Sequence, residues 1–309
     1  MPLFLYILMI PIELFSYILR SFSLAIRLSA NIIAGHTLVH ILASSIAMLC
    51  NVRSLIVVFP FYKTRISNLT AVITPPLTQW LPVLKTDQSV HYSIDSFLRA
   101  LPKCAILDLT IKPENIFTNP DQGYRVNFKY SYVIPYHEVK ENFKLKYNEG
   151  LRRNLREAEK NYTVVDSNDI NKYLGLCKSS YHLRNMKPPS WLDSIVPKVV
   201  DALHQHKSGK VIMAFDKGEP IAGILTGWDG DTTYYLLGGR TGSEQGSSAH
   251  ALLLDHAINE AQSRGHKFDF EGSMHSGIAN FFQSFGATPE RYLQIRKFTG
   301  TGKLWSLFH

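Results

Sequence analysis

The sequence predicts an α/β (α+β) fold in which helices flank a mixed sheet, with a hydrophobic α-helical segment in front of it. The first observation is the uneven distribution of charge: residues 1–50 hold only one of the chain's 25 acids and two of its 33 bases. The second is the alternation of apolar and polar residues over 124–132, which is typical of a half-buried strand. Third, later segments repeat apolar residues every three to four positions, as amphipathic helices do.

Composition excludes several classes of protein. The chain has 309 residues, of which 45% are hydrophobic and 19% charged, and this is too apolar for a disordered chain. Its net charge of +8 suits a polyanionic ligand, an RNA or an anionic membrane face without choosing among them. Its three cysteines, Cys50, Cys104 and Cys177, include no CxxC pair, so we expect neither a disulfide framework nor a metal site.

The N-terminal segment, residues 1–51, resembles membrane sequence. Residues 3–19 and 21–50 are almost entirely apolar, and each approaches the roughly 20 residues that cross a hydrocarbon core. A secretory signal peptide would begin with basic residues and be about half as long, so the membrane interpretation ranks higher. We therefore expect a helical hairpin that stands apart from the rest, a membrane-associated chain, and a soluble, cytoplasmic remainder over residues 52–309.

The first half of the remainder predicts strands and one basic helix. Paired prolines at 75 and 76 exclude a helix and mark a loop over 74–79. Residues 104–112 read as a strand, and Pro135 ends the alternating strand that begins at residue 124. Between 138 and 160, apolar residues recur at helical spacing opposite a basic face, which predicts an amphipathic helix with a bend allowed at Gly150.

The second half predicts two helices followed by hairpin strands and a helix–strand–helix–strand ending. Turn residues at 216–218 and 229–231 separate three apolar runs and are typical of antiparallel hairpins. The expected helices cover 169–183, 191–207, about 248–264 and about 278–285. The expected strands cover 211–215, 221–226, 232–237, 267–271 and 291–298.

This order of elements resembles the second half of a GNAT-type acyltransferase. Four segments narrow the resemblance to the FemAB-like branch of that superfamily, and it spans residues from about 53 to 300. The segments are 74–79 (TPPLTQ), 151–160 (LRRNLREAEK), 268–274 (FDFEGSM) and 281–287 (FFQSFGA). The resemblance implies incomplete tandem GNAT modules, 52–160 and 161–309, and an N-acyltransferase that moves an acyl or aminoacyl group from a small-molecule donor to an amine acceptor.

A different resemblance covers the first 50 residues. Residues 11–36 contain the pattern R-L-x-x-N-x-x-A-G-H and look like the central helices of subunit a of the F-type ATP synthase. In that family the arginine, here Arg27, faces the rotor carboxylate, and Asn31 and His36 belong to the same pattern. The alternative function is therefore proton transport by a membrane subunit that contacts the ATP synthase rotor, and a third alternative is an inactive fusion of the two parts.

The acyltransferase resemblance directs attention to the segment 238–248. Its backbone amides and the start of the next helix are suited to a phosphate group, so acyl-CoA is a candidate co-substrate. An ordinary solvent loop of small residues is the alternative. The candidate donor-binding residues are Gly238, Gly239, Arg240, Gly242, Gly246 and Ser247. We expect this segment to close one end of a groove between the strands 232–237 and 267–271.

Three residues near the second of these strands are candidates for taking the proton of the amine. Asp269 and Glu271 share one face of the predicted strand, opposite Phe268 and Phe270, and either carboxylate could act as general base. His275 is a further candidate, because its ordinary pKa lies closer to neutral pH. The alternative for Asp269 is a structural role, in which it accepts backbone N–H groups and holds a neighbouring loop.

Arg152, Arg153 and Arg156 form a basic patch on the predicted helix. These side chains are suited to RNA phosphates or a polyanionic substrate, and a solvated helix face is the alternative. The tryptophans form no recognisable stacking set, so a nucleic-acid-binding module ranks only third among the functions.

Overall fold

The computed structural model describes residues 57–66, 68–85, 92–112, 123–137, 143–300 and 302–303. The predicted helical hairpin and the candidate residues Arg27, Asn31 and His36 lie outside the described residues. Among the residues that are described, no helix combines the length and the apolar character needed to cross a membrane.

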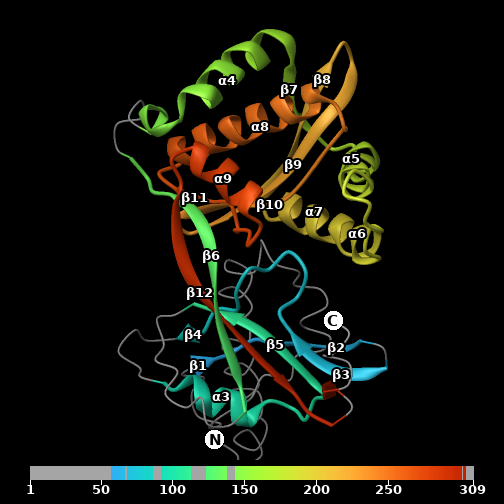
Figure 1. Ribbon diagram of the computed structural model, residues 1–309, viewed down its shortest axis with the longest axis vertical. Helices are drawn as coiled ribbons and strands as arrows, with labels where there is room; N and C mark the ends of the chain where they lie inside the picture. Colours follow the sequence, from blue (N-terminus) through green and yellow to red (C-terminus); the bar gives the residue numbers. More distant parts are fainter. Residues whose placement is uncertain are drawn as a thin grey trace, which may run out of the picture.

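A mixed sheet of ten strands is the frame of the described structure (Figure 1). Its strands, in spatial order, are β2 (Tyr62–Ile66), β3 (Leu69–Ile73), β5 (Ile106–Ile111), β12 (Thr288–Phe298), β6 (Arg125–Ile134), β11 (Lys267–Asp269), β10 (Thr232–Arg240), β9 (Glu219–Asp229), β8 (Gly209–Asp216) and β7 (Thr163–Ser167). The pairs β3–β5 and β10–β11 are parallel, and the other neighbours are antiparallel. A separate two-stranded pair joins β1 (Val57–Val58) and β4 (Leu84–Lys85).

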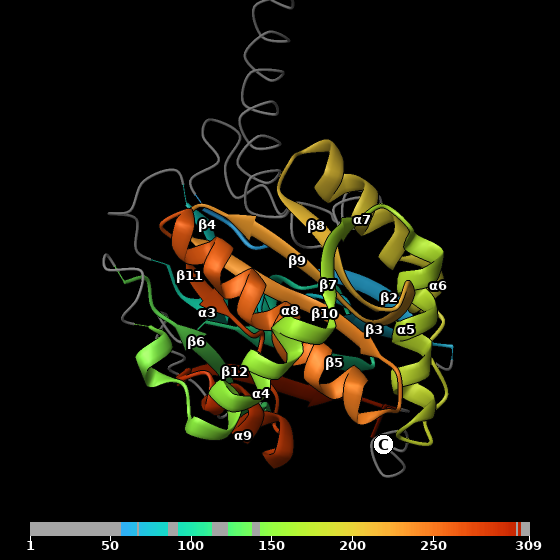
Figure 2. The same cartoon turned by 90° about the horizontal axis from the view of Figure 1, so that it is seen from above.

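Helices cover both faces of the half of the sheet made by β7 to β10. On β8, Ile212 and Ala214 pack into one apolar cluster with α8 (Glu244–Ser263) and α4 (Glu149–Asn161). The alternate residues Val211 and Met213 pack into a second cluster with α5 (Ile170–His182), α6 (Trp191–Ser194) and α7 (Val196–Gln205). Figure 2 shows these two groups of helices on opposite sides of the strands, as the period-two alternation of a strand requires.

Two long strands join this half to the other. β6 and β12 run from the upper helical part to the lower part in Figure 1, and they pair from Thr288 opposite Val133 to Arg296 opposite Arg125. The lower part has its own apolar cluster, in which α3 (Ile94–Ala100) packs against β5 and β12. α9 (Ser276–Ser284) completes the upper part, where Phe282 stacks on Phe270.

The predicted mixed α/β fold with flanking helices is confirmed, but the strand β7 was not predicted, the helix predicted over 191–207 is divided into α6 and α7, and two predicted helix starts are wrong. The basic helix begins at Glu149 because the side chain of Asn148 accepts the Leu151 N–H at 2.7 Å and caps it. Before this cap lies a short 3-10 helix, Lys144–Lys146. α8 begins at Glu244, four residues earlier than expected, because Ser243 caps it through the Gly246 N–H.

Two strand boundaries also differ. The strand expected over 267–271 ends at Asp269, because Glu271 has a left-handed backbone with φ of 55°. The final strand begins at Thr288 rather than residue 291, because its first residues pair with the end of β6. Tertiary pairing, which local patterns do not report, therefore sets the start of β12.

Candidate functional site

A cavity of about 700 Å³ lies where β10 and β11 separate. The two strands pair only from Thr232 to Tyr234, and a bulge at Leu236 then turns β10 away while β11 ends. Leu236 and Leu237 line the cavity from β10, and Glu271 lines it from the turn after β11. The cavity thus reaches the groove that the sequence predicts between these strands, but most of its lining comes from the segment 73–79 and from β5, β6 and β12.

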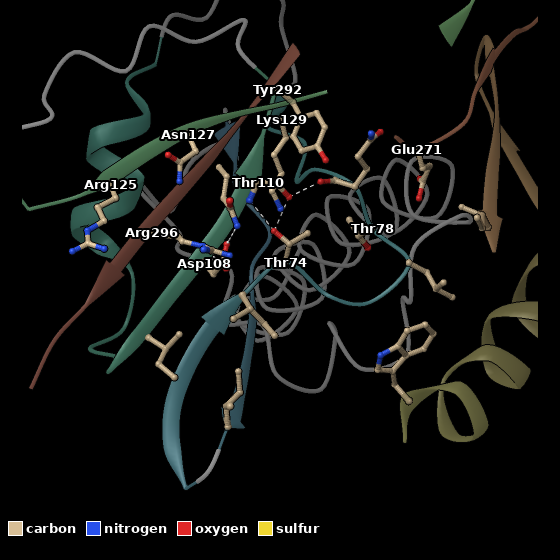
Figure 3. Close-up of a pocket in the computed structure, with 18 of the residues that line it drawn as sticks. Thr74, Thr78, Asp108, Thr110, Arg125, Asn127, Lys129, Glu271, Tyr292 and Arg296 are labelled. Atoms are coloured by element: carbon tan, nitrogen blue, oxygen red, sulfur yellow. Dashed lines mark hydrogen bonds and ion pairs between the residues drawn. The ribbon is translucent and has the colours of Figure 1, made fainter. Parts of the chain in front are cut away.

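Three neighbouring strands supply the polar wall of the cavity, which we call the polar face. Its residues alternate with apolar residues such as Leu109, Leu293 and Ile295, which are buried in the core on the opposite side. The polar face consists of Asp108 and Thr110 on β5, Tyr292, Gln294 and Arg296 on β12, and Arg125, Asn127 and Lys129 on β6 (Figure 3).

Strand register arranges the polar face in rows across the sheet. Arg296 lies between Asp108 and Arg125, and Gln294 lies between Thr110 and Asn127. Tyr292 is paired with Lys129, which is the row closest to the helical half. These pairings keep each row at the spacing of adjacent strands, so the side chains of a row reach the same part of the cavity.

Asp108 is the fixed acceptor of this wall. Its carboxylate accepts one hydrogen bond from Gln294 Nε2 at 2.6 Å and one from Arg296 Nε at 2.9 Å. Both of its oxygens are thereby used, and the terminal nitrogens of Arg296, which lines the cavity, make no hydrogen bond with a described residue. The pKa of Lys129 is lowered by burial, which reflects its position deeper in the wall.

Glu271 and Asp269 form a carboxyl pair at the end of β11. Asp269 is buried and accepts the Ser131 hydroxyl and, at 2.8 Å, the Glu271 N–H. Burial raises the pKa of Asp269 to about 6. The pKa of Glu271 is raised well above its ordinary value, first by burial and then by the nearby Asp269 charge. Glu271 lines the cavity, and the Asp269 carboxylate fixes the backbone that presents it.

His275 lies apart from this pair. It is exposed at the start of α9 and does not line the cavity. Its backbone N–H is bonded to the Ser273 hydroxyl. Among the three residues predicted to take a proton, the described structure brings only Glu271 to the cavity wall.

The segment predicted to bind the donor is mostly not a loop. Gly238, Gly239 and Arg240 are the last residues of β10, and Gly246 and Ser247 lie in the first turns of α8. A side chain at Gly239 would strike the backbone of Cys177 and Leu176 in α5. A side chain at Gly246 would lie 2.7 Å from the Thr241 carbonyl oxygen. Close packing therefore accounts for these two glycines without a ligand.

The other residues of this segment have protein partners of their own. The Arg240 N–H donates to the Ser180 hydroxyl at 2.8 Å, and its guanidinium donates to the Thr241 carbonyl at 3.1 Å. Leu183 covers Gly242. None of the six predicted donor-binding residues lines the cavity at β10 and β11.

The predicted basic patch is on α4, and none of its residues lines the cavity at the polar face. Arg152, Arg153 and Arg156 are exposed on this helix. Arg153 also lines a smaller pocket of about 370 Å³ between α4 and the start of α8.

The sequence reasoning missed the polar face. A usable signal was present, because 125, 127 and 129 and also 292, 294 and 296 alternate polar residues with apolar ones. The alternation over 124–132 predicts one buried face, but it does not indicate what the polar side of the strand faces. Only the strand order places these two polar sides next to each other.

Comparison with known proteins confirms the first resemblance. The model of the acetyltransferase (GNAT) domain family matches residues 146–281. The structure of FemX superposes with a TM-score of 0.59 at 14% identity, over 86% of this chain and 91% of that one. L-PGS from Bacillus licheniformis superposes with a TM-score of 0.54 at 16% identity, over 79% of this chain and 82% of that one. At these identities the likeness shows the fold, which is GNAT-like.

The N-terminal resemblance is also confirmed. The ATP synthase A chain family model matches residues 1–75. ATP synthase subunit a of Mycosarcoma maydis is 49% identical over 63 residues, which are 19% of this chain and 25% of that protein. The same subunit of Anaplasma marginale (strain St. Maries) is 55% identical over 42 residues, 14% of this chain and 17% of that protein. The chain thus spans about a quarter or less of the length of these relatives. The last residues of the family match include β2 and β3, which are strands of the ten-stranded sheet.

Proposed function

We propose that this chain is an N-acyltransferase that moves an acyl or aminoacyl group onto an amine acceptor in the cavity at β10 and β11. The observation that carries the proposal is the position of Glu271, a carboxyl group with a raised pKa that lines the cavity where the parallel strands separate. Perturbed carboxyl groups in a cleft are candidates for proton transfer, and the GNAT-like fold supports the reaction class.

The proposed reaction is a nucleophilic substitution at a carbonyl carbon. The amine nitrogen of the acceptor attacks that carbon, a C–N bond forms, and the bond between the carbonyl carbon and the leaving group breaks. The leaving thiolate or alkoxide departs with the electron pair, and the nitrogen loses one proton. Glu271 accepts this proton in its ionised form, and its raised pKa makes it a stronger base than an ordinary carboxylate.

Asp269 has a positioning role in this proposal. Its carboxylate accepts the Glu271 N–H and the Ser131 hydroxyl, so it fixes the turn that aims Glu271 at the cavity. Its charge also contributes to the raised pKa of Glu271. Asp269 itself does not line the cavity.

The identity of the acyl donor remains a prediction. Acyl-CoA would need free backbone amides at the start of α8 for its pyrophosphate. Two features do not fit that group: the Gly246 N–H is already bonded to Ser243, and Glu244 places a carboxylate in the first helical turn. No step is therefore assigned to CoA, and the donor is described only as an activated acyl or aminoacyl ester or thioester.

The test is amide formation by the protein and by its Glu271→Gln variant. Acetyl-CoA and an aminoacyl-tRNA would be supplied in turn with a primary amine, and the amide product would be measured by mass spectrometry. We expect Glu271→Gln to lower turnover by about 10² while the circular dichroism spectrum is unchanged, because general base catalysis contributes about that factor. Glu219→Gln, at an exposed carboxylate on β9, is the matched control.

Two results would contradict the proposal. Unchanged turnover in Glu271→Gln would remove Glu271 as the base while leaving the reaction class in place. If neither acetyl-CoA nor the aminoacyl-tRNA yielded an amide product, the transferase function itself would be contradicted.

Proton transport is the second candidate function, and the match of residues 1–75 to the ATP synthase A chain favours it. Arg27, Asn31 and His36 would be the residues of the proton path, and the rotor of the ATP synthase would be the partner. The test is proton flux into vesicles that contain the protein together with a rotor ring. Flux that stops in Arg27→Gln would support this function, and equal flux with and without the protein would contradict it.

A further inference from the structure

The polar face contains basic residues that the proposed proton transfer does not use. Arg125, Lys129 and Arg296 line the cavity, and Asp108 is the one acidic residue of the polar face. Glu271 adds a second carboxyl, and burial shifts the pKa values of both Glu271 and Lys129 toward their neutral forms, which leaves two arginines against Asp108. The wall therefore carries excess positive charge.

We infer that the acceptor is an elongated molecule with an acidic group at the end opposite its amine, and that Arg125 and Arg296 bind this acidic group. The inference rests on the proposed function for the role of the molecule as acceptor. The acidic group is a carboxylate or a phosphate, because both present paired oxygens to a guanidinium fork.

The spacing of the cavity-side residues along β6 gives the minimum length of the acceptor. Arg125, Asn127, Lys129 and Ser131 follow one another on the cavity side of the strand, and Ser131 bonds Asp269. Arg125 thus lies six residues before the residue that contacts the carboxyl pair, which is about 20 Å of extended strand. Figure 3 shows Arg125 and Glu271 at opposite sides of the cavity. An acceptor that reaches both must be long.

The two arginines form a cross-strand pair with unused donors. Arg125 and Arg296 are directly paired in the β6–β12 register. Arg125 is exposed and makes no ion pair with any described residue. The Nε of Arg296 donates to Asp108, and its two terminal nitrogens make no hydrogen bond with a described residue. Asp108 balances only one of these two positive charges, so a ligand anion would be stabilised between the arginines.

A buried amide between the two ends also points to a ligand. The Gln79 side chain is 8% exposed and lines the cavity. Neither of its polar atoms has a hydrogen-bond partner within 3.5 Å among the described residues. The Tyr292 side chain interacts with this amide at longer range, so the described residues leave at least one of its two polar atoms without a partner. Such buried polar groups are rare unless something pairs with them. An acceptor with hydrogen-bonding atoms along its length would supply that partner.

The experiment measures equilibrium binding by titration calorimetry, so it does not depend on turnover. The probe has a primary amine and a carboxylate joined by four ethylene glycol units, which makes it long and polar. Its partner probe has a primary amide in place of the carboxylate, and a third probe with a single ethylene glycol unit tests length. The protein variants are Arg125→Gln and, as a control, Arg65→Gln, an exposed arginine of β2 that does not line the cavity.

We expect the long acid to bind the parent protein about tenfold more tightly than the long amide and the short acid, which is the scale of one charge-assisted interaction. Arg125→Gln should remove the preference for the acid, and Arg65→Gln should retain it. Equal binding of acid and amide, an unchanged preference in Arg125→Gln, or no binding of any probe would overturn the inference. Acid-dependent binding without amide formation in the donor assay would leave this site standing and contradict the transferase function.

Discussion

Glu271 is a single residue whose backbone conformation has a visible cause. A residue other than glycine in the left-handed region costs about 1 kcal/mol, and Glu271 has φ of 55°. The next residue, Gly272, has φ of 69°, and a side chain there would strike the Tyr130 carbonyl of β6. The Asp269 carboxylate bonds the Glu271 N–H and stabilises this turn. The neighbouring groups therefore hold Glu271 in place against the strain.

The raised pKa of Glu271 predicts the pH dependence of acyl transfer. A general base must be ionised, so kcat/KM should rise with pH and reach half its maximum well above pH 4.5. Replacing Asp269 by Asn removes a nearby negative charge that raises the pKa of Glu271. The rise should therefore move to lower pH in Asp269→Asn, and a pH–rate profile of both proteins would measure the shift.

The same profile in Glu271→Gln provides the control for this prediction. The rise assigned to Glu271 should be absent there, and only the titration of the acceptor amine should remain. A rise that stays at the same pH in Asp269→Asn would show that the two carboxyl groups do not interact during catalysis.

Gly239 offers a test between packing and donor binding. A methyl group at this position would meet the backbone of α5, and overpacking of this kind costs about 1–3 kcal/mol. Gly239→Ala should therefore lower the free energy of unfolding, measured by urea titration. Gly242→Ala should cost less, because the atom in the way is the end of the half-exposed Leu183 side chain, 2.6 Å from the added carbon. Normal stability with lost donor binding in Gly239→Ala would instead support the donor-binding role.

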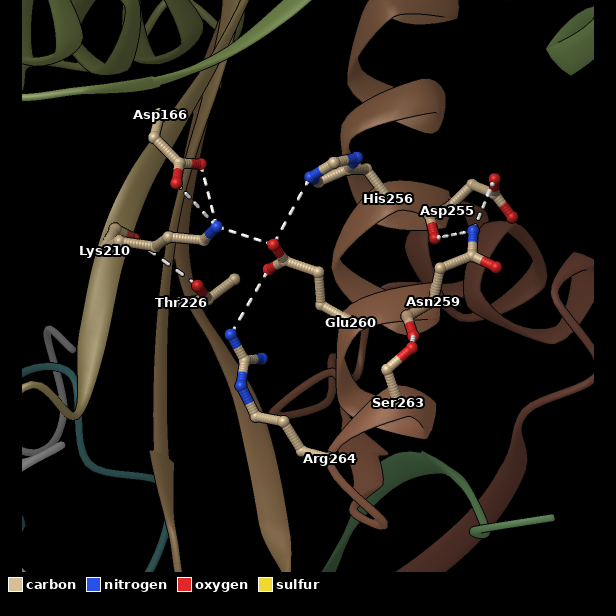
Figure 4. A network of polar contacts seen from close by, with 9 residues as sticks. All are labelled: Asp166, Lys210, Thr226, Asp255, His256, Asn259, Glu260, Ser263 and Arg264. Carbon is tan, nitrogen blue, oxygen red and sulfur yellow. Dashed lines mark hydrogen bonds and ion pairs between the residues drawn. The ribbon is translucent and has the colours of Figure 1, made fainter. Parts of the chain in front are cut away.

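At the scale of elements, a network of charged side chains links α8 to the neighbouring strands β7 and β8 (Figure 4). Lys210 of β8 contacts Glu260 of α8 at 2.6 Å and Asp166 of β7 at 2.8 Å. Arg264 and His256 also contact Glu260, at 3.6 and 3.5 Å. Asp166, His256 and Glu260 lie close enough to hold a metal ion, but the Lys210 ammonium already lies among them and supplies the positive charge. The network therefore reads as a structural ion-pair cluster.

This network predicts a change of stability with pH. Burial alone would raise the pKa of Glu260, but hydrogen bonds from His256 and Lys210 outweigh it and lower the pKa to about 2. The native state thus favours ionised Glu260, and its stabilisation is present above about pH 4.5 and is lost as the pH falls toward 2. With the Glu260 side chain 27% exposed, the effect at pH 7 should be about 1 kcal/mol.

Chemical denaturation of the parent protein and of Glu260→Gln at several pH values would measure this contribution of Glu260 to the free energy of unfolding. The variant should be less stable than the parent at pH 7, and the difference should narrow as the pH falls below 4. Glu219→Gln, at an exposed position without these partners, should match the parent throughout. A difference that is constant with pH would rule out an ionic origin.

At the scale of the whole molecule, the two halves share strands. β6 lies between β12 and β11, so a chain divided into 52–160 and 161–309 would leave β12 without either of its neighbours, β5 and β6, and would leave β11 paired with β10 alone. Unpaired strand edges promote aggregation. We therefore expect residues 161–309 expressed alone to aggregate, whereas residues 52–309 should remain folded. Size-exclusion chromatography and circular dichroism of both fragments would check this, and a monomeric, folded 161–309 fragment would contradict it.

The sequence by itself determined the mixed α/β fold, most elements of its second half and the two resemblances. Period-two alternation in β6 and helical spacing in α8 are local properties, so they could be read along the chain. The sequence also predicted a groove between the strands 232–237 and 267–271, because the GNAT resemblance implies that the sheet splits there. It singled out Glu271 as a candidate, although on a strand that ends two residues earlier.

Only the tertiary structure decided which residues share the site. Arg125 and Arg296 are 171 positions apart in the chain, and β-sheet register makes them neighbours. Register depends on long-range pairing that no local pattern reports. In the same way, the sequence predicted that Gly239 binds a phosphate, but the α5 backbone lies against this residue. It also placed Asp269 among the candidates for the general base, but the Asp269 carboxylate is buried and accepts the Ser131 hydroxyl and the Glu271 N–H. Packing between distant segments settled these positions, because only the folded chain brings their partners within contact distance.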